Sequence, residues 1–136
     1  MNLRMMLRLS LGVMVLMMTA VATAHHSFAG RFDGSRALHL EGVVASVEVT
    51  NPHSYIYLDV RTADGEFQRW ALEGPSVLHL RRRGWEQVVK AGDTLGVCGY
   101  VSTDTSRRLS AAVLMLASGE KRLWENYRQG KCGLDH

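Results

Sequence analysis

The sequence predicts a mainly β protein, a small Greek-key barrel that follows a cleaved signal peptide. Short segments with alternating apolar side chains, bounded by glycine, proline or aspartate, recur over residues 37–124. One helical segment, near residues 75–84, interrupts them after the third strand. Three strands, a helix and two further strands, with a bent first strand, form the element order of the OB-fold. A compact β-sandwich is the alternative architecture.

The first 24 residues have the three-part layout of a secretory signal peptide. Arg4 and Arg8 precede an apolar run over residues 9–21, which is too short for a comfortable membrane span. Ala22-Thr23-Ala24 then forms a small-x-small cleavage signal, and a cut after Ala22 is the alternative. We therefore expect a periplasmic or secreted protein, processed by the Sec route.

Cleavage after Ala24 changes the composition of the chain. Removing 24 of the 136 residues leaves 112, enough for one domain with a modest core. All 13 acidic residues remain but only 14 of the 16 basic ones, so the net charge falls from +3 to +1. Such a domain has no strong reason to bind nucleic acid. We expect the barrel over residues 25–124, an irregular tail over 125–136 and no membrane span in the mature form.

The first two strands lie on either side of a corner. The first is expected from Ala37 to Val49, and its apolar parity slips near Gly42 and Val43, which indicates a bulge or a bend. The second, over residues 53–61, alternates strictly. Its apolar face carries Ile56, Leu58 and Val60, and its other face carries His53, Tyr55, Tyr57 and Asp59.

The remaining elements are expected in close succession. Ala63-Asp64-Gly65 turns the chain into a third strand over residues 67–73. Pro75 at the start, three arginines at the end and Gly84 just beyond predict a short helix. Further strands are expected over residues 94–101, 108–116 and 120–124.

The corner between the first two strands is Thr50-Asn51-Pro52-His53. Proline fixes its own φ and lacks a backbone donor, so it is tolerated at the start of a strand and not in its middle. The Asn51 side chain can accept the backbone N–H of His53, two residues on. The corner thus holds one imidazole in place, although a histidine in such a position is more often a half-buried strand residue bonded to a neighbour.

The mature amino terminus offers a partner for that imidazole. Cleavage after Ala24 gives His25 a free α-amine beside its own imidazole, and His26 or His53 can add a further nitrogen. The cut after Ala22 instead makes His25 the third residue. The terminal amine, two backbone amides and the His25 imidazole can then also bind copper(II) or nickel(II). Imidazole and amine ligands suit copper, nickel and zinc. We expect copper at His25, His26 and His53, with Asn51 orienting the His53 ring. Two histidines at a chain terminus are not by themselves a site.

Tyr55, Tyr57 and Trp70 support a metal-free alternative. These aromatic side chains could stack on an envelope component or a partner protein, as OB-folds do with their ligands. Cross-strand tyrosines also stabilise sheets without any ligand.

Two cysteines leave a second alternative open. In an oxidising compartment, Cys98 and Cys132 can form a bridge that ties the tail to a strand, worth ~3 kcal/mol. Cys98 can equally be a buried thiol beside a loose tail.

An enzymatic function finds little support. The chain has no nucleophile elbow, phosphate-binding glycine loop or zinc-protease helix, and no heme-attachment motif. His39 and His79 have no partners by spacing. A copper-histidine oxidative enzyme is a weaker third hypothesis.

Eight short motifs occur in a specific order along the chain. They are His25-His26-Ser27-Phe28, Phe32-Asp33, Gly42-Val43-Val44, Thr50-Asn51-Pro52-His53, Trp70-Ala71-Leu72-Glu73, Arg82-Arg83-Gly84-Trp85, Ala91-Gly92-Asp93 and Gly99-Tyr100. In this order they resemble a family of small secreted bacterial proteins known only as a domain of unknown function. The resemblance runs from His25 to about Leu123. It implies an exported OB-like barrel without an established activity, in which His25, His26 and His53 act together. His79, the two cysteines and the tail after Trp124 depart from it.

Overall fold

The computed structural model describes residues 28–124 and 131–132. The chain divides into two compact units, and the first ends at Arg31 while the second begins at Phe32. In the first unit, residues 28–31 form a turn closed by the Arg31 N–H, which donates to the Phe28 carbonyl at 2.9 Å. His25, His26 and the expected signal peptide lie outside the described residues.

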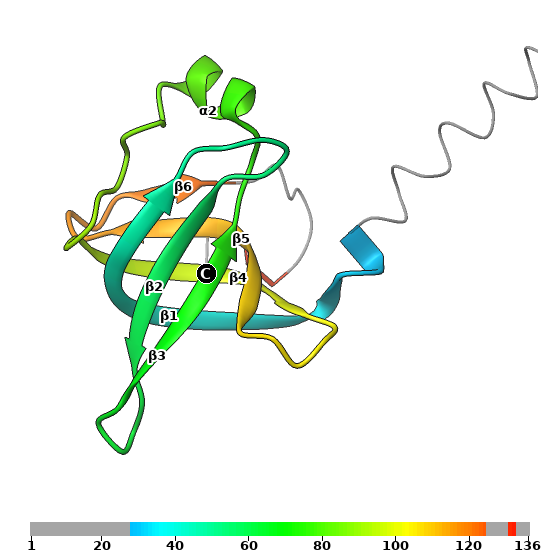
Figure 1. The fold of residues 1–136 in the computed structure, drawn as a ribbon, viewed down its shortest axis with the longest axis vertical. Coiled ribbons are helices and arrows are strands. Elements are labelled where there is room, and N and C mark those ends of the chain that lie inside the picture. The colour runs from blue at the N-terminus through cyan, green and yellow to red at the C-terminus, as the bar shows by residue number, and fades with distance from the viewer. Residues whose placement is uncertain (1–27, 125–130, 133–136) are drawn as a thin grey trace, which may run out of the picture. The chain divides into compact units, whose positions relative to one another are not determined.

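The second unit is a single six-stranded sheet that curls into a barrel (Figure 1). The strands are β1 (Phe32–Glu48), β2 (Tyr55–Arg61), β3 (Phe67–Glu73), β4 (Thr94–Ser102), β5 (Arg108–Leu116) and β6 (Lys121–Leu123). Their order is β3-β2-β1-β4-β5-β6, with antiparallel neighbours throughout. A parallel pairing of β3 with the start of β5 closes the ring. The predicted OB-like barrel is confirmed.

Strand β1 is shared by both halves of the barrel, which requires it to bend. It pairs with β4 up to Val43 and with β2 from Val43 onward, and the β2 register shifts between Val44 and Ser46. Gly42 permits the crossing, because a Cβ there would collide with the backbone carbonyl of Asp59. The bulge therefore lies just beyond the predicted position. The strand also begins earlier than expected, at Phe32. Its first residues pair irregularly and show no alternation, so the sequence pattern does not predict this start.

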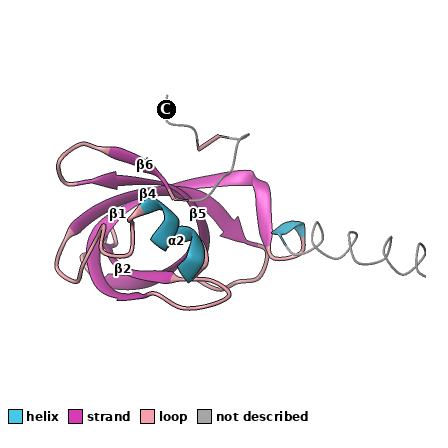
Figure 2. Cartoon of the chain, turned by 90° about the horizontal axis from the view of Figure 1, so that it is seen from above, coloured by secondary structure: helices cyan, strands magenta, loops and turns pink. Residues whose placement is uncertain are grey.

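Helix α2 (Val77–Arg83) follows β3 and lies across one end of the barrel (Figure 2). Its Leu80 is fully buried in the core. Gly84 ends the helix in the left-handed conformation, at φ 65°, as its sequence position predicts. Ser76 precedes the helix without capping it through its side chain. In the described residues, no helix is both long enough and apolar enough to cross a membrane.

The core fills the interior of the ring, and Trp124 is part of it. The buried apolar residues include Val44, Ile56, Leu58, Leu72, Leu95, Val97, Leu109 and Leu114. Trp124 is 1% exposed and packs against Gly74, where any Cβ would collide with the indole. Its backbone N–H donates to the Ala112 carbonyl at 2.8 Å. The last strand is thus held beside β5 by both packing and hydrogen bonding.

A disulfide joins Cys98 of β4 to Cys132, 34 residues further along the chain, with their Cα atoms 5.5 Å apart. The sequence left open whether Cys98 forms a bridge with Cys132 or is a buried thiol, and in the structure the bridge is formed. Both cysteines are 3% exposed.

Candidate functional site

The corner between β1 and β2 is fastened to the segment that follows β3. The Ser54 N–H donates to the Pro75 carbonyl at 2.9 Å, and the Gly74 N–H donates to the Ser54 carbonyl at 2.8 Å. The Ser54 hydroxyl bonds back to the carbonyl of Thr50 at 3.3 Å. The peptide between Asn51 and Pro52 is cis. The backbone that carries His53 is therefore fixed from both sides.

The His53 imidazole turns one nitrogen inward. Its Nδ1 lies 3.2 Å from the Gly74 carbonyl oxygen and 3.6 Å from Oε1 of Glu73. A carbonyl only accepts hydrogen bonds, so Nδ1 carries the proton and donates it. In the neutral ring, Nε2 then keeps its lone pair. The side chain is 36% exposed, and no described residue forms a hydrogen bond with Nε2.

Glu73 lies beneath this imidazole and is itself buried, with 4% of its surface exposed. Its Oε2 accepts the Tyr55 hydroxyl at 3.2 Å. A buried carboxylate is costly unless it has such partners. Tyr55, Glu73 and His53 therefore form a short polar chain that leads from the sheet to the exposed edge of the imidazole.

The Asn51 side chain does not form the hydrogen bond that was expected within the corner. Its side-chain oxygen accepts the N–H of Val77 at 3.2 Å rather than that of His53. It thereby caps the first turn of α2, where Ser76 supplies no side-chain hydrogen bond. The group that orients His53 is the Gly74 carbonyl, with Glu73 beside it.

Sequence reasoning missed Glu73, although a signal for it was present. The β2–β3 hairpin turns about Asp64, so residues equally distant from Asp64 lie opposite each other. This register pairs Tyr55 with Glu73 and places both on the face that the alternation of β2 leaves polar.

The aromatic face is smaller than expected. Tyr55 and Tyr57 stack with ring centroids 6.3 Å apart, and the Tyr57 hydroxyl donates to Glu48 at 3.4 Å. Burial, together with the charge of Glu48, raises the pKa of Tyr57. Trp70 pairs with Leu58 and packs against the core, which places it on the opposite face of the sheet. The three aromatic residues therefore do not form one surface.

The other described histidines lie in different surroundings. His39 of β1 places Nε2 3.2 Å from the Sγ of Cys98. His79 of α2 has a buried Nε2 without a hydrogen-bond partner among the described residues. Burial, and then the charges of Arg83 and Arg82, lower the pKa of His79. Across residues 28–124 and 131–132, no three histidine, cysteine, aspartate or glutamate side chains are grouped to hold a metal.

Strand order, helix position and the parallel closure of β3 on β5 define a small OB-fold barrel with one oriented histidine at a corner. Residues 13–110 match DUF6152, a family of unknown function, and the chain belongs to that family. The expected membership of an uncharacterised domain family is thus confirmed. Neither a curated protein nor a solved structure gives a significant match.

Proposed function

We propose that this protein, once exported, binds a copper ion through His53 and its mature amino-terminal histidines, His25 and His26. The observation that carries the proposal is the hydrogen bond from His53 Nδ1 to the Gly74 carbonyl, beside the buried carboxylate of Glu73. Metal-binding histidines generally donate their second ring N–H to a carbonyl or a carboxylate, which fixes the tautomer and the ring orientation. The His53 ring has this arrangement.

The amino terminus supplies the donors that the corner lacks. One imidazole is too few ligands for a specific site, and Glu73 uses its oxygens on Tyr55 and His53. The α-amine and imidazole of His25 add two nitrogens, and His26 can add a third. Nitrogen ligands of this kind bind copper(II) more tightly than nickel(II) or zinc(II). The carboxylate of Glu73, beside Nδ1, favours a cation bound at Nε2 of the same ring.

Export is part of the proposal because the α-amine of His25 exists only after cleavage. The layout of residues 1–24 supports it. The bridge between Cys98 and Cys132 supports it independently, since disulfides persist in oxidising compartments.

The test is a copper(II) titration of the processed protein and of three variants, His25→Ala, His53→Ala and His79→Ala. We expect one equivalent of copper(II) to bind tightly to the wild type and to His79→Ala, which removes a histidine that is not a proposed ligand. We expect weaker binding in the other two variants. Equal affinity in all four proteins would refute the proposal.

A second candidate function is metal-free binding on the face around Tyr55 and Tyr57. The two rings are stacked, and their hydroxyls are held by Glu73 and Glu48, which makes the pair a rigid, half-exposed platform. Tyr57→Ala discriminates between the candidates, because the Tyr57 hydroxyl donates to Glu48, whereas Glu73 accepts from Tyr55. Metal-free binding predicts that partner capture is lost in Tyr57→Ala and survives a chelator, whereas copper binding is unchanged in this variant.

A further inference from the structure

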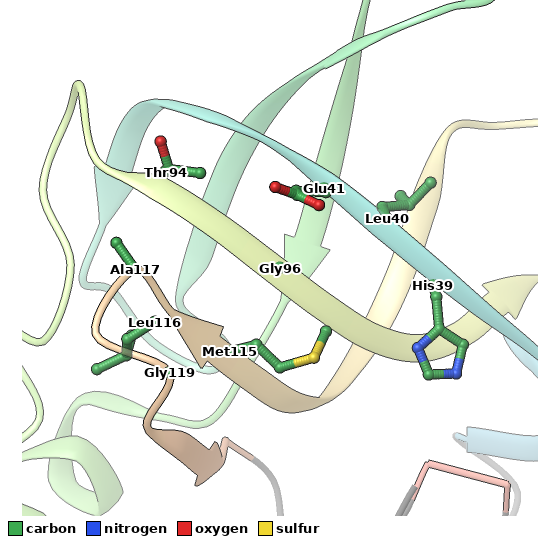
Figure 3. Close-up of a pocket in the computed structure, with 9 residues that line it drawn as sticks. All are labelled: His39, Leu40, Glu41, Thr94, Gly96, Met115, Leu116, Ala117 and Gly119. Carbon is green, nitrogen blue, oxygen red and sulfur yellow. The ribbon is translucent and has the colours of Figure 1, made fainter.

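The sheet face formed by β1, β4 and β5 gathers several soft metal-binding side chains. Along the strand register, His39 lies opposite Cys98, and Glu41 lies opposite Gly96, which is itself opposite Met115. His39, Gly96 and Met115 line a groove of about 690 Å³ (Figure 3). Gly96 leaves room for the Met115 side chain, whose methyl group would lie 2.9 Å from a Cβ at that position.

Within this face, an imidazole touches the disulfide. His39 Nε2 lies 3.2 Å from the Sγ of Cys98, which is bonded to Cys132. His39 itself is exposed, whereas both cysteines are buried. Two sulfurs and one imidazole nitrogen thus share one location at the surface of the barrel.

We propose that reduction of this disulfide creates a second metal site, in which Cys98, Cys132 and His39 bind a thiophilic ion such as copper(I). A dithiol reductant supplies two electrons and two protons. The bond between the two cysteine sulfurs breaks, two thiols form, and the reductant becomes a disulfide. Metal binding then displaces the two thiol protons into solvent. In the oxidised protein the sulfurs are bonded to each other, so the three side chains do not form a metal-binding group among the described residues.

The geometry suits a shared ion. Metal–thiolate and metal–imidazole bonds of about 2.3 and 2.0 Å place two tetrahedral ligands about 3.5 Å apart. The observed separation of 3.2 Å between Nε2 and Sγ is close to this value. It follows from the pairing of β1 with β4, in which His39 and Cys98 are register partners.

Cys132 stays within reach after reduction. It lies eight positions after Trp124, which is buried and bonded to Ala112. A fully extended chain of that length spans at most about 28 Å, so the second thiolate keeps a high local concentration at the site.

The donor set selects the kind of ion. Two thiolates and an imidazole favour copper(I) or zinc(II) over harder ions. The thioether of Met115, in the same groove as His39, adds a preference for copper(I). This site is separate from the corner at His53, whose donors do not change when the disulfide is reduced.

The test is an anaerobic copper(I) titration with bicinchoninate as the competing chelator. It compares the oxidised protein with protein reduced by a phosphine, in the wild type, His39→Gln and His79→Gln. We expect one additional equivalent on reduction, with thiolate-to-copper charge-transfer absorption. His39→Gln should weaken this equivalent by at least about tenfold, since even groups around the ligands alter metal affinity by that amount. His79→Gln should match the wild type.

Three results would overturn the proposal. One is the same copper(I) stoichiometry before and after reduction. Another is equal affinity in His39→Gln and the wild type, which would reduce the site to two free thiols. The third is loss of the β-sheet circular dichroism on reduction, because the site requires β1 and β4 to hold His39 beside Cys98. Failure of the corner site leaves all three readouts unchanged, so the two proposals fail separately.

Discussion

Glu73 lies beside the hydrogen bond that orients the His53 imidazole, and its carboxylate sets the electrostatic surroundings of the ring. It is buried, accepts the Tyr55 hydroxyl and lies 3.6 Å from Nδ1 of His53. We predict that Glu73→Gln weakens copper(II) binding about tenfold, because a neutral amide beside the oriented ring no longer favours the positive charge of the bound ion. Isothermal titration of the processed protein measures this. Glu48→Gln is the matched control, since Glu48 contacts Tyr57 instead, and equal affinities of the two variants would contradict the role of Glu73.

Asp104 organises the loop between β4 and β5 and introduces a pH dependence. Hydrogen bonds from the hydroxyl of Ser106, the hydroxyl of Ser102 and the N–H of Ser106 lower the pKa of Asp104 from 3.8 to about 2. A pKa that is lower in the folded state gives stability above the unfolded value, and this stability is lost as the pH falls through the folded value. We therefore predict that Asp104→Asn lowers Tm at neutral pH and that the difference closes between pH 3.8 and about 2. A difference that stays constant down to pH 2 would contradict this.

The surroundings of His53 show which contacts the sequence predicts and which it does not. His53 was placed at the corner because proline restricts the local backbone, which is a short-range effect. Its contact with Gly74 is long-range and depends on the closure of the barrel. Local patterns contain no information about which carbonyl the ring will meet, so they favour a polar side chain of the same corner, Asn51.

Helix α2 depends on that same Asn51, which acts across the fold rather than along the chain. The helix has only seven residues, and its own Ser76 provides no side-chain cap. We predict that Asn51→Ala destabilises the protein by about 1 kcal/mol, the usual cost of losing a cap, and leaves copper affinity unchanged. Denaturant unfolding and titration measure the two effects. Asn51→Asp is the control, since it keeps the acceptor oxygen and suits the helix N-terminus.

The opposite outcome would support the expectation that Asn51 orients the His53 ring. If Asn51→Ala weakened copper binding without a change in the free energy of unfolding, the side chain would act on the His53 ring rather than on α2.

Turn residues predicted several strand boundaries correctly. β3 and β5 begin and end where the sequence predicts, because a turn or a polar loop bounds each strand at both ends. The start of β1 was missed because residues 33–36 are polar or small and exposed or half-buried. They form an irregularity in the ladder, which pairs Phe32 with Ser102 and resumes at Ala37 opposite Tyr100.

The whole barrel was predictable because element order restricts topology more strongly than any single strand does. Three strands, a helix and two strands with a bent β1 allow few compact closures, and the parallel pairing of β3 with β5 is the one that forms. The disulfide was not predictable in this way, because Cys132 lies in a tail without periodicity. Its pairing with Cys98 is a tertiary result.

That disulfide stabilises the molecule by restricting the unfolded chain. For a loop closed over 34 residues, we predict that Cys132→Ser lowers the free energy of unfolding by about 3–4 kcal/mol. The barrel should stay folded, since the ladder of β1 through β5 forms without the tail. Urea unfolding measures the loss, and Lys131→Ser, an exposed neighbour, is the control. A midpoint that matches the control would show that the bridge contributes nothing to stability.

Native intact-mass analysis of the protein recovered from the exported fraction tests the central claim most directly. The predicted result is a chain lacking residues 1–24, with one copper ion in the wild type and none in His53→Ala. A processed chain that carries no metal in the presence of copper, or one that keeps its copper when His53 is replaced, would contradict the proposed site at the corner.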